Sequence, residues 1–384
     1  MPTTPMKNLF YRAALPLMSP SMKGQYSHQA EGLTGLREYE RILARHHVAG
    51  ASLLLKDGDR VAWAHTSCQR PAHHAGPGMM YRVASITKMA TALVVLMACD
   101  EGLFTLDTPV RTLLPMGNSN ELRGVTVRHL LSHTSGLADT GNLTSFLRRG
   151  KTFLDLLATP NVTACKPGEK MIYSNFGFGL LGCALESVYG QTVEEIFQTK
   201  LFKPLGMHAT LDASRLGEAL IMPIARMLPY KANREVTIPS LGRKPLTSPD
   251  PLRRFGHTAG AMYTDAPSLS RLLTLIAQGG QIDGQRLVSE ALMREMTARQ
   301  ASTPTRTYGL GLVLLERRKL SSHPLLGHQG FAYGCVDGAF VEVGTGRQVI
   351  FLNGGASEAR TGLLGLVNRD VLTWALRREM PSWT

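Results

Sequence analysis

The sequence is short of cysteine, of acidic residues and of long apolar runs, and each shortage excludes a class of protein. Five cysteines (68, 99, 165, 183 and 335) occur in 384 residues without a Cys-x-x-Cys pair, which argues against a disulfide framework and against a zinc knuckle. The longest apolar run, from Thr91 to Cys99, is shorter than the roughly 18 to 20 residues of a membrane-spanning helix. With 43% hydrophobic residues the chain can still form a large core, so it is not an intrinsically disordered protein.

The shortage of acidic residues leaves a basic chain. There are 42 Lys and Arg against 29 Asp and Glu, a formal net charge of +13. The basic clusters, such as Arg253-Arg254 and Arg377-Arg378, are short, scattered and not interleaved with aromatic residues, so we expect no nucleic-acid partner. A positive field can still steer anionic substrates toward the protein, an effect that salt weakens.

The N-terminus has a basic residue and a short apolar patch, as a signal peptide does. Arg12 and Pro16 interrupt that patch, and no small-residue cleavage site follows it. We therefore expect residues 1–27 to form a poorly ordered arm and the protein to be cytoplasmic.

Strand patterns occur near both ends of the chain. Residues 49–65 are typical of a hairpin that turns at 56–59, and residues 339–343 and 348–353 are typical of a second hairpin. Helical patterns cover residues 35–46, 85–102 and 360–378, and the middle of the chain is mostly helical.

This order of elements predicts an α+β fold, in which one antiparallel sheet is built from N- and C-terminal segments and flanked by helices. We expect a single catalytic domain over residues 28–384, with an α/β part at about 28–84 and 291–384 and a mostly helical part at about 85–290.

The first motif that carries chemistry is Ser85-Ile86-Thr87-Lys88, a Ser-x-x-Lys at the start of an apolar helix. Residues three apart lie on one helix face, so the Lys88 amine can reach the Ser85 hydroxyl. Such a hydroxyl is a poor nucleophile until a base removes its proton, and a lysine loses its charge readily when it is buried. Alone, the motif also fits a helix cap followed by a surface lysine.

Two further motifs support a catalytic role. In Tyr173-Ser174-Asn175 the phenol can relay a proton if cations lower its pKa, and the amide can both hold Lys88 and donate to a substrate carbonyl. His328-Gln329-Gly330 lies in a glycine-rich segment, where an edge strand can approach a ligand closely.

With these three motifs in this order, the chain resembles the superfamily of serine β-lactamases, DD-peptidases and family VIII esterases, whose motifs are S-x-x-K, Y-x-N and K-T-G or H-x-G. Residues 130–137 (Leu-Leu-Ser-His-Thr-Ser-Gly-Leu) and 204–207 (Pro-Leu-Gly-Met) also resemble segments of that family. The resemblance extends over about residues 35–375 and implies the β-lactamase/transpeptidase-like fold.

The resemblance also implies an acyl-enzyme mechanism. Ser85 would be the nucleophile, Lys88 its base, and Tyr173 the proton shuttle to the leaving group. Asn175 would orient Lys88 and the substrate amide. His328, Gln329, Gly330 and Phe331 would line the substrate, and the backbone N–H groups of Ser85 and Phe331 would form the oxyanion hole.

The third motif departs from the lactamase form, because His328 replaces Lys and Gln329 replaces Thr. A mostly neutral imidazole thus stands where an ammonium would bind a β-lactam carboxylate. The resemblance is then closer to DD-carboxypeptidases, D-amino-acid peptidases and esterases. We expect a small-molecule or short-peptide substrate, either a D-amino-acid peptide or amide or a small acyl ester. A β-lactamase, an acyltransferase and a non-catalytic binding paralogue are the alternatives.

No metal or cofactor is expected. His129 and His133 have the i, i+4 spacing of a zinc site, but the sequence lacks the Glu of H-E-x-x-H. No serine lies in a G-x-S-x-G elbow, which argues against an α/β-hydrolase. Arg306 and Arg317 are possible binders of a substrate carboxylate, although no motif supports either residue.

Overall fold

The structure is a computed structural model that describes residues 25–377 except 70–71, 117–120, 140–145, 147–148, 160–163, 228–229, 234–244, 317–319 and 333. The expected N-terminal arm lies outside the described residues up to position 24, and its last two residues, Tyr26 and Ser27, already belong to strand β1. Arg317 also lies outside the described residues.

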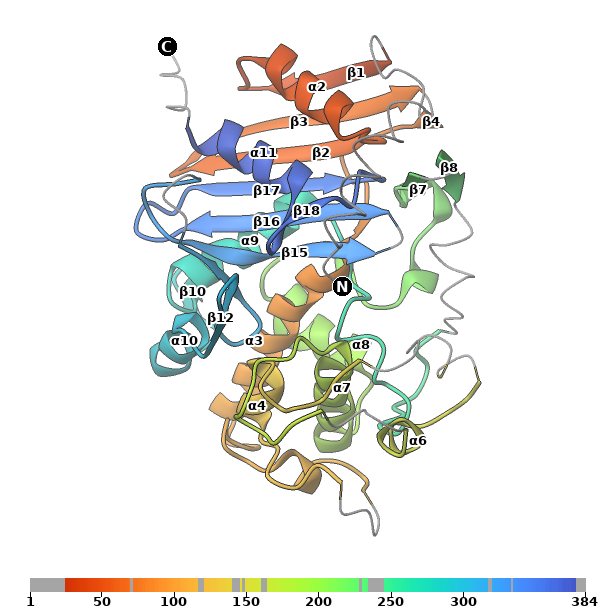
Figure 1. Cartoon of the computed structure of the whole chain (residues 1–384), viewed down its shortest axis with the longest axis vertical. Coiled ribbons are helices and arrows are strands. Elements are labelled where there is room, and N and C mark those ends of the chain that lie inside the picture. Colours follow the sequence, from red (N-terminus) through yellow and green to blue (C-terminus); the bar gives the residue numbers. More distant parts are fainter. Residues whose placement is uncertain are drawn as a thin grey trace.

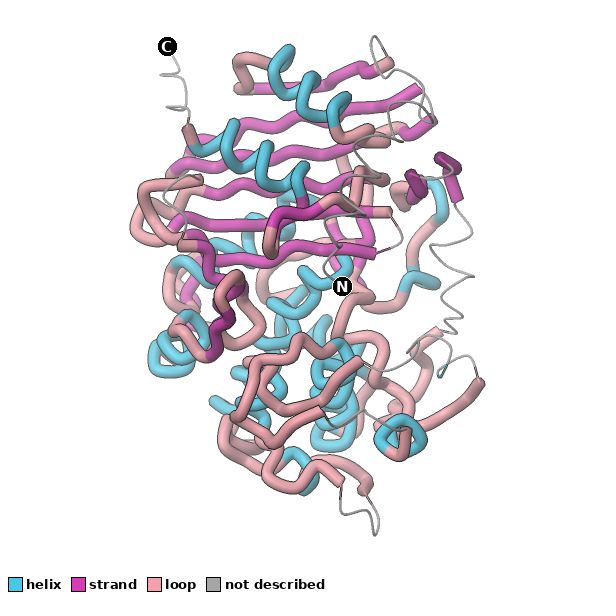
Figure 2. The backbone as a smooth tube through the Cα atoms, viewed as in Figure 1, coloured by secondary structure: helices cyan, strands magenta, loops and turns pink. Residues whose placement is uncertain are grey.

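One large antiparallel sheet dominates the fold (Figures 1 and 2). Its strands lie in the order β1 (Tyr26–Glu31), β3 (Arg60–Gln69), β2 (Ala51–Asp57), β17 (Gln348–Asn353), β16 (Cys335–Glu342), β15 (Leu325–Ala332), β14 (Val313–Leu315), β13 (Arg306–Tyr308) and β12 (Ala301–Thr303), and β4 (Ala72–His73) pairs with β3. N- and C-terminal segments meet where β2 pairs with β17, with Leu53 opposite Phe351. The prediction of a sheet assembled from both ends of the chain is confirmed.

Helices α2 (Leu36–Arg45) and α11 (Leu366–Leu376) cover one face of the sheet, in front of it in Figure 1. Successive side chains of β2 point to opposite faces of the sheet. Leu53 and Leu55 therefore lie in the core under these helices, and Leu54 lies in the core on the other face. The expected start of the closing helix at residue 360 is wrong. Residues 360–365 form a small hairpin, β18 (Arg360–Thr361) and β19 (Leu364–Gly365), because Gly362 takes a positive φ of 63° and turns the chain.

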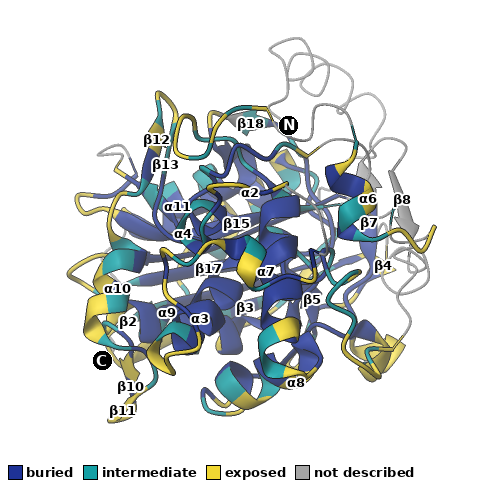
Figure 3. Cartoon of the chain, turned by 90° about the horizontal axis from the view of Figure 1, so that it is seen from below, coloured by how far each residue is buried: buried dark blue, intermediate teal, exposed yellow. Residues whose placement is uncertain are grey.

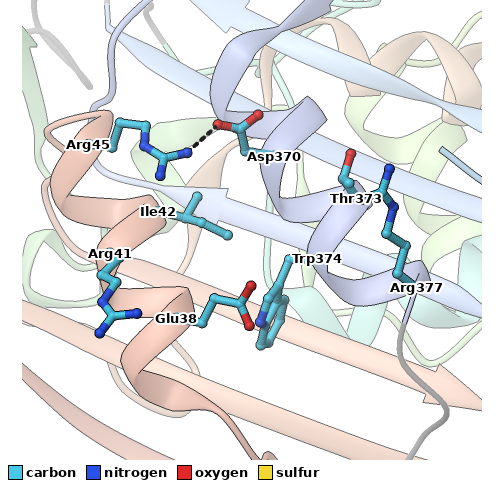
Figure 4. A pocket seen from close by; sticks show the side chains of 8 residues that line it. All are labelled: Glu38, Arg41, Ile42, Arg45, Asp370, Thr373, Trp374 and Arg377. Atoms are coloured by element: carbon cyan, nitrogen blue, oxygen red, sulfur yellow. Dashed lines mark hydrogen bonds and ion pairs between the residues drawn. The ribbon is translucent and has the colours of Figure 1, made fainter. Parts of the chain in front are cut away.

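A polar groove of about 400 Å³ separates α2 from α11 (Figure 4). Arg41 and Arg45 project into it from α2, and Arg377 lies at the end of α11. Asp370 accepts hydrogen bonds from Arg45 at 3.3 Å and from His46 at 2.8 Å. These contacts tie the two helices together on the outer face of the sheet.

The other face carries the larger core. Helix α3 (Thr87–Asp100) is buried all round, with twelve buried residues. Figure 3 colours the chain by burial, with buried residues in dark blue. Helix α9 (Ala266–Ala277) packs against β2, β16 and β17. Residues 266–277, expected in the mostly helical part, thus form a helix that lies on the sheet.

Among the described residues, the remaining elements are the 15-residue helix α7, shorter helices and a few short strands. They are η1 (Ala84–Ile86), η2 (Val110–Thr112), α4 (Val127–Leu131), α6 (Phe153–Leu157), α7 (Asn175–Tyr189), α8 (Val193–Phe197), η3 (Gln198–Phe202), η4 (Ala213–Arg215), η5 (Glu218–Leu220), α10 (Glu290–Thr297), β5 (Tyr81–Arg82), β6 (Ala209–Thr210), β7 (Ile224–Met227), β8 (Tyr230–Asn233), β9 (Tyr263–Thr264), β10 (Gln281–Ile282) and β11 (Gln285–Arg286). Within the described part of the chain, no helix has the length and apolar character needed to cross a membrane.

Candidate active site

The Ser-x-x-Lys motif lies where η1 joins α3, directly below the sheet. Ala84 has a φ of 45°, an unfavourable left-handed conformation for a residue with a side chain, and it precedes the half-buried Ser85. The Ser85 hydroxyl caps no backbone N–H of the helix. It accepts hydrogen bonds from Lys88 Nζ at 3.2 Å and from Tyr173 OH at 2.8 Å. The three residues expected to carry the chemistry are thus in direct contact.

Lys88 is the only fully buried lysine among the described residues, and three oxygens hold its amine. Besides Ser85 Oγ, Nζ donates to Asn175 Oδ1 at 2.7 Å and to the Ala259 carbonyl at 2.6 Å. Burial lowers the pKa of Lys88 from 10.5 to about 7, opposed by the charge of Asp139 and assisted by that of Arg82. A substantial neutral fraction near pH 7 is what a general base requires.

Tyr173 is held by an aromatic cluster. Its ring centroid lies 4.3 Å from that of His133, 6.1 Å from that of Tyr308 and 6.4 Å from that of His328. The condition that cations hold its pKa down is not met: burial raises the pKa of Tyr173 well above 10, nearby Tyr308 adds to the effect, and the charge of Arg360 opposes it only in part. The phenol therefore stays protonated at neutral pH, and Lys88 is the better base.

Asn175 orients Lys88, and the residue that orients Asn175 is Asp139, which sequence reasoning missed. Asp139 Oδ2 accepts from Asn175 Nδ2 at 2.7 Å and from the Asn175 backbone N–H at 3.0 Å. Its Oδ1 accepts from the Phe176 N–H at 3.0 Å, so the carboxylate also caps the start of α7. The Asn175 amide is thus fixed with its oxygen toward Lys88. One of its two N–H groups is already used, which leaves one for a substrate.

The His328-Gln329-Gly330 segment lies on β15, where alternate side chains point to opposite faces. His328 shares the face of the catalytic cluster, whereas Gln329 Oε1 accepts from the Gly365 N–H at 3.0 Å on the other face, and its amide donates to the Leu363 carbonyl. The Gln329 side chain therefore points away from the catalytic cluster, and only its backbone can meet a substrate beside Ser85. Gly330 lies against η1, since a Cβ there would come within 2.2 Å of the Val83 carbonyl oxygen.

The His328 imidazole is neutral. Burial, reinforced by the charge of Lys88, lowers its pKa to about 3, and its Nδ1 lies 2.7 Å from the Gln329 carbonyl. The Nε2 atom is buried and has no hydrogen-bond partner among the described residues. The position of a fixed positive charge in lactamases thus holds an uncharged ring here.

The backbone N–H of Phe331 points away from β16. Opposite it, Val336 directs both of its backbone polar groups to Asn353 on β17, at 3.4 and 2.8 Å, so Phe331 and Val336 form a non-hydrogen-bonded pair. On its other edge, β15 pairs with β14 over residues 325–327. After Gly327, this edge of β15 lies against η1. The Phe331 N–H therefore faces the side from which Ser85 approaches, as an oxyanion hole requires.

The two histidines with zinc-like spacing serve other purposes. His129 Nδ1 lies within 3.1 Å of the Thr126 hydroxyl, and His133 Nδ1 accepts from the Ser174 N–H at 3.2 Å. Across the described ranges, no group of three His, Cys, Asp or Glu side chains is placed to hold a metal ion.

Comparison with known proteins agrees with this geometry. The β-lactamase family model matches residues 36–371, and the chain belongs to that family. The chain is 30% identical to penicillin-binding protein 4 of Amycolatopsis lactamdurans, over 68% of both chains. The structure of a D-stereospecific amidohydrolase from Streptomyces sp. is 26% identical and superposes with a TM-score of 0.64, over 85% of this chain and 93% of that one. D-amino acid amidase from Ochrobactrum anthropi SV3, 21% identical, shares the fold with a TM-score of 0.68, over 89% of this chain and 98% of that one. Membership of this family supports a serine hydrolase.

Proposed function

We propose that this protein hydrolyses an amide or ester through an acyl intermediate on Ser85. The observation that carries the proposal is the Ser85 hydroxyl, which contacts both a lysine amine at 3.2 Å and a tyrosine hydroxyl at 2.8 Å. The edge of β15 beside it offers the Phe331 N–H to a developing oxyanion.

In the acylation step, Lys88 in its neutral form accepts the Ser85 proton while Oγ bonds to the substrate carbonyl carbon. The carbonyl oxygen becomes an oxyanion against the backbone N–H groups of Ser85 and Phe331. As the bond to the leaving group breaks, Tyr173 donates its proton to the departing nitrogen or oxygen, and Lys88 returns a proton to Tyr173. Water then attacks the acyl-enzyme by the same proton transfers in reverse, and free Ser85 is regenerated.

We favour a substrate derived from a D-amino acid, either an amide or a short peptide, with small acyl esters as the second class. The relatives at 30% and 26% identity are a penicillin-binding protein and a D-stereospecific amidohydrolase. The neutral His328 offers no fixed charge to a β-lactam carboxylate. We therefore expect penicillin to be turned over more slowly than either preferred class.

Two arginines give the site a positive field. Arg360 stacks on the Phe331 ring with its Cζ 3.5 Å from the ring centroid. Its charge acts on Tyr173 and Tyr308, and that of Arg306 acts on Tyr308. Arg306 is one of the two arginines that the sequence leaves open as carboxylate binders, and no sequence motif points to Arg360. We propose that this pair binds an anionic group of the substrate.

The test is a turnover assay on matched substrates. D-alanine amide, L-alanine amide, D-alanyl-D-alanine, p-nitrophenyl acetate and benzylpenicillin are each incubated with the wild type and with Ser85→Ala. Turnover that depends on Ser85 and is faster for the D- than for the L-amide is expected. Undiminished turnover in Ser85→Ala overturns the mechanism, and faster penicillin hydrolysis than amide hydrolysis overturns the substrate class.

A further inference from the structure

A pocket lies over strands β2 and β3, away from Ser85. It encloses about 420 Å³. In the sheet, β2 is separated from β15 by β17 and β16. The floor is three cross-strand pairs whose side chains share one face: Ser52 with His65, Leu54 with Trp63, and Lys56 with Val61. The start of α9 forms one wall and residues 76–79 form another.

The two ends of this pocket carry opposite charges. At one end the buried Asp265 lies close enough to His65 to act on its ionisation, and burial keeps that imidazole mostly neutral by lowering its pKa. At the other end is Lys56, whose Nζ contacts Thr274 of α9 at 3.5 Å and makes no ion pair among the described residues. Because Ser52 and Lys56 are four residues apart on a strand, the two ends lie about 13 Å apart.

Between the ends the lining is apolar and aromatic. Leu54, Met79 and Pro267 contribute aliphatic surface. The Trp63 ring lies 5.0 Å from the His65 ring and leaves the indole half-exposed toward the pocket. A cavity that is mostly apolar and has a few convergent polar groups is the usual form of a small-molecule site.

We propose that this pocket binds a short zwitterionic peptide of two or three residues with an apolar side chain. Its ammonium group lies against Asp265, with the Trp63 indole beside it, and its carboxylate meets the Lys56 ammonium. The apolar side chain fills the space over Leu54. A ligand with only one charge leaves one end of the pocket unmatched.

This inference stands apart from the proposed function, because it uses no residue of the Ser85 cluster. Binding is measured in the Ser85→Ala variant, which removes the proposed turnover. The readout is the fluorescence and the indole N–H resonance of Trp63, with Trp63→Phe identifying its signal among the three tryptophans of the chain. A perturbation of Trp63 reports this pocket and not the catalytic one.

The probes are the tripeptide Gly-Phe-Gly, its N-acetylated form and its C-terminal amide. Saturable binding of the free peptide is expected. Acetylation of the peptide, or Asp265→Asn in the protein, should lower the affinity about tenfold. Amidation of the peptide, or Lys56→Met in the protein, should also lower it about tenfold. Asp265 also caps α9 by accepting from the Ser268 N–H at 2.8 Å, and its other carboxylate oxygen lies 3.6 Å from Nδ1 of the exposed His208. Asn keeps the cap, so Asp265→Asn is the matched variant, and His208→Gln controls for the lost histidine contact.

The decisive result is whether each change to the peptide and its matching mutation lower the affinity by removing the same interaction. Acetylation should cost little further affinity in Asp265→Asn, and amidation little further in Lys56→Met, because each pair removes one interaction. The proposal is overturned if the losses in affinity are additive or if all three probes bind with equal affinity. It is also overturned if the Trp63 signals show no saturable change at peptide concentrations up to about 10 mM. Thermal unfolding of both variants near the wild-type midpoint excludes misfolding as the cause.

Discussion

The molecule contains two serines in similar hydrogen-bonded surroundings, and only one of them has what a nucleophile needs. Ser85 contacts Tyr173 OH at 2.8 Å and Lys88 Nζ at 3.2 Å, and Ser52 contacts Tyr81 OH at 2.8 Å and His65 Nδ1 at 2.8 Å. Each therefore has a phenol and a nitrogen base.

The backbone around the two serines differs. Ser52 is 2% exposed and lies within β2, paired to β3 on one side and to β17 on the other, so its strand offers no free N–H to an oxyanion. Ser85 is half-buried at the start of a helix, next to the unpaired edge of β15. A hydroxyl with a base is therefore insufficient: access for the substrate carbonyl and N–H donors for its oxygen decide which serine reacts.

Exchanging each serine for alanine gives the largest contrast. We expect Ser85→Ala to lower kcat by at least about 10³-fold, because the atom that forms the acyl bond is removed. Ser52→Ala should keep kcat/KM within about threefold of the wild type, since Ser52 lies outside the site. Steady-state turnover of a D-aminoacyl amide measures both. Equal losses of kcat/KM in the two variants would contradict the claim that Ser85, and not Ser52, is the nucleophile.

Mutating the hydrogen-bond partners of Ser85 should lower kcat, whereas mutating those of Ser52 should not. We expect Lys88→Ala and Tyr173→Phe each to lower kcat by at least about 10², the scale of lost general acid–base catalysis. His65→Gln, the matched change at Ser52, should leave kcat within a few-fold. Near-wild-type rates in either Lys88→Ala or Tyr173→Phe would contradict the role given to that residue.

The pH dependence sharpens the assignment of the base. Burial lowers the pKa of Lys88 to about 7, and the base is its neutral form, so kcat/KM should rise as the pH increases through about 7. The charge of Asp139 raises that pKa, so Asp139→Asn should shift the midpoint to lower pH and also lower kcat several-fold by releasing Asn175. A pH–rate profile of both proteins provides the measurement. An unmoved midpoint would mean that the charge of Asp139 does not act on Lys88.

The smallest expected effect is on folding. Ser52→Ala removes two hydrogen bonds and leaves the buried Tyr81 hydroxyl without its partner, which should lower the free energy of unfolding by about 1 to 3 kcal/mol. Denaturant unfolding of this variant and of Ser52→Thr, which keeps a hydroxyl, tests this. A stability unchanged by Ser52→Ala would show that the network is not structural.

The spacing of the sequence was enough to predict the chemistry that depends on local geometry. Ser85 and Lys88 share a helix face because they are three residues apart. The expected hairpin turns at Gly58-Asp59, since Asp57 pairs with Arg60. The strand patterns at both ends of the chain likewise predicted that N- and C-terminal strands pair in one sheet, as β2 and β17 do.

What depends on tertiary packing was missed or wrong. Asp139 lies 36 residues from the amide that it fixes, with no spacing rule to connect them. Gln329 belongs to the third motif, but its side chain turns to the face opposite the catalytic cluster because Gly365 and Leu363 of the β18–β19 hairpin bind it there. The pKa of Tyr173 depends on burial among His133, Tyr308 and His328, which only the fold brings together.

The most direct test of the account is covalent labelling with a fluorophosphonate, read by intact mass and peptide mapping in the wild type, Ser85→Ala and Ser52→Ala. The account predicts one adduct per chain on Ser85, absent from Ser85→Ala and retained in Ser52→Ala. An adduct that persists in Ser85→Ala, or one that maps to Ser52, would contradict the claim that accessible geometry and oxyanion donors make Ser85 the nucleophile.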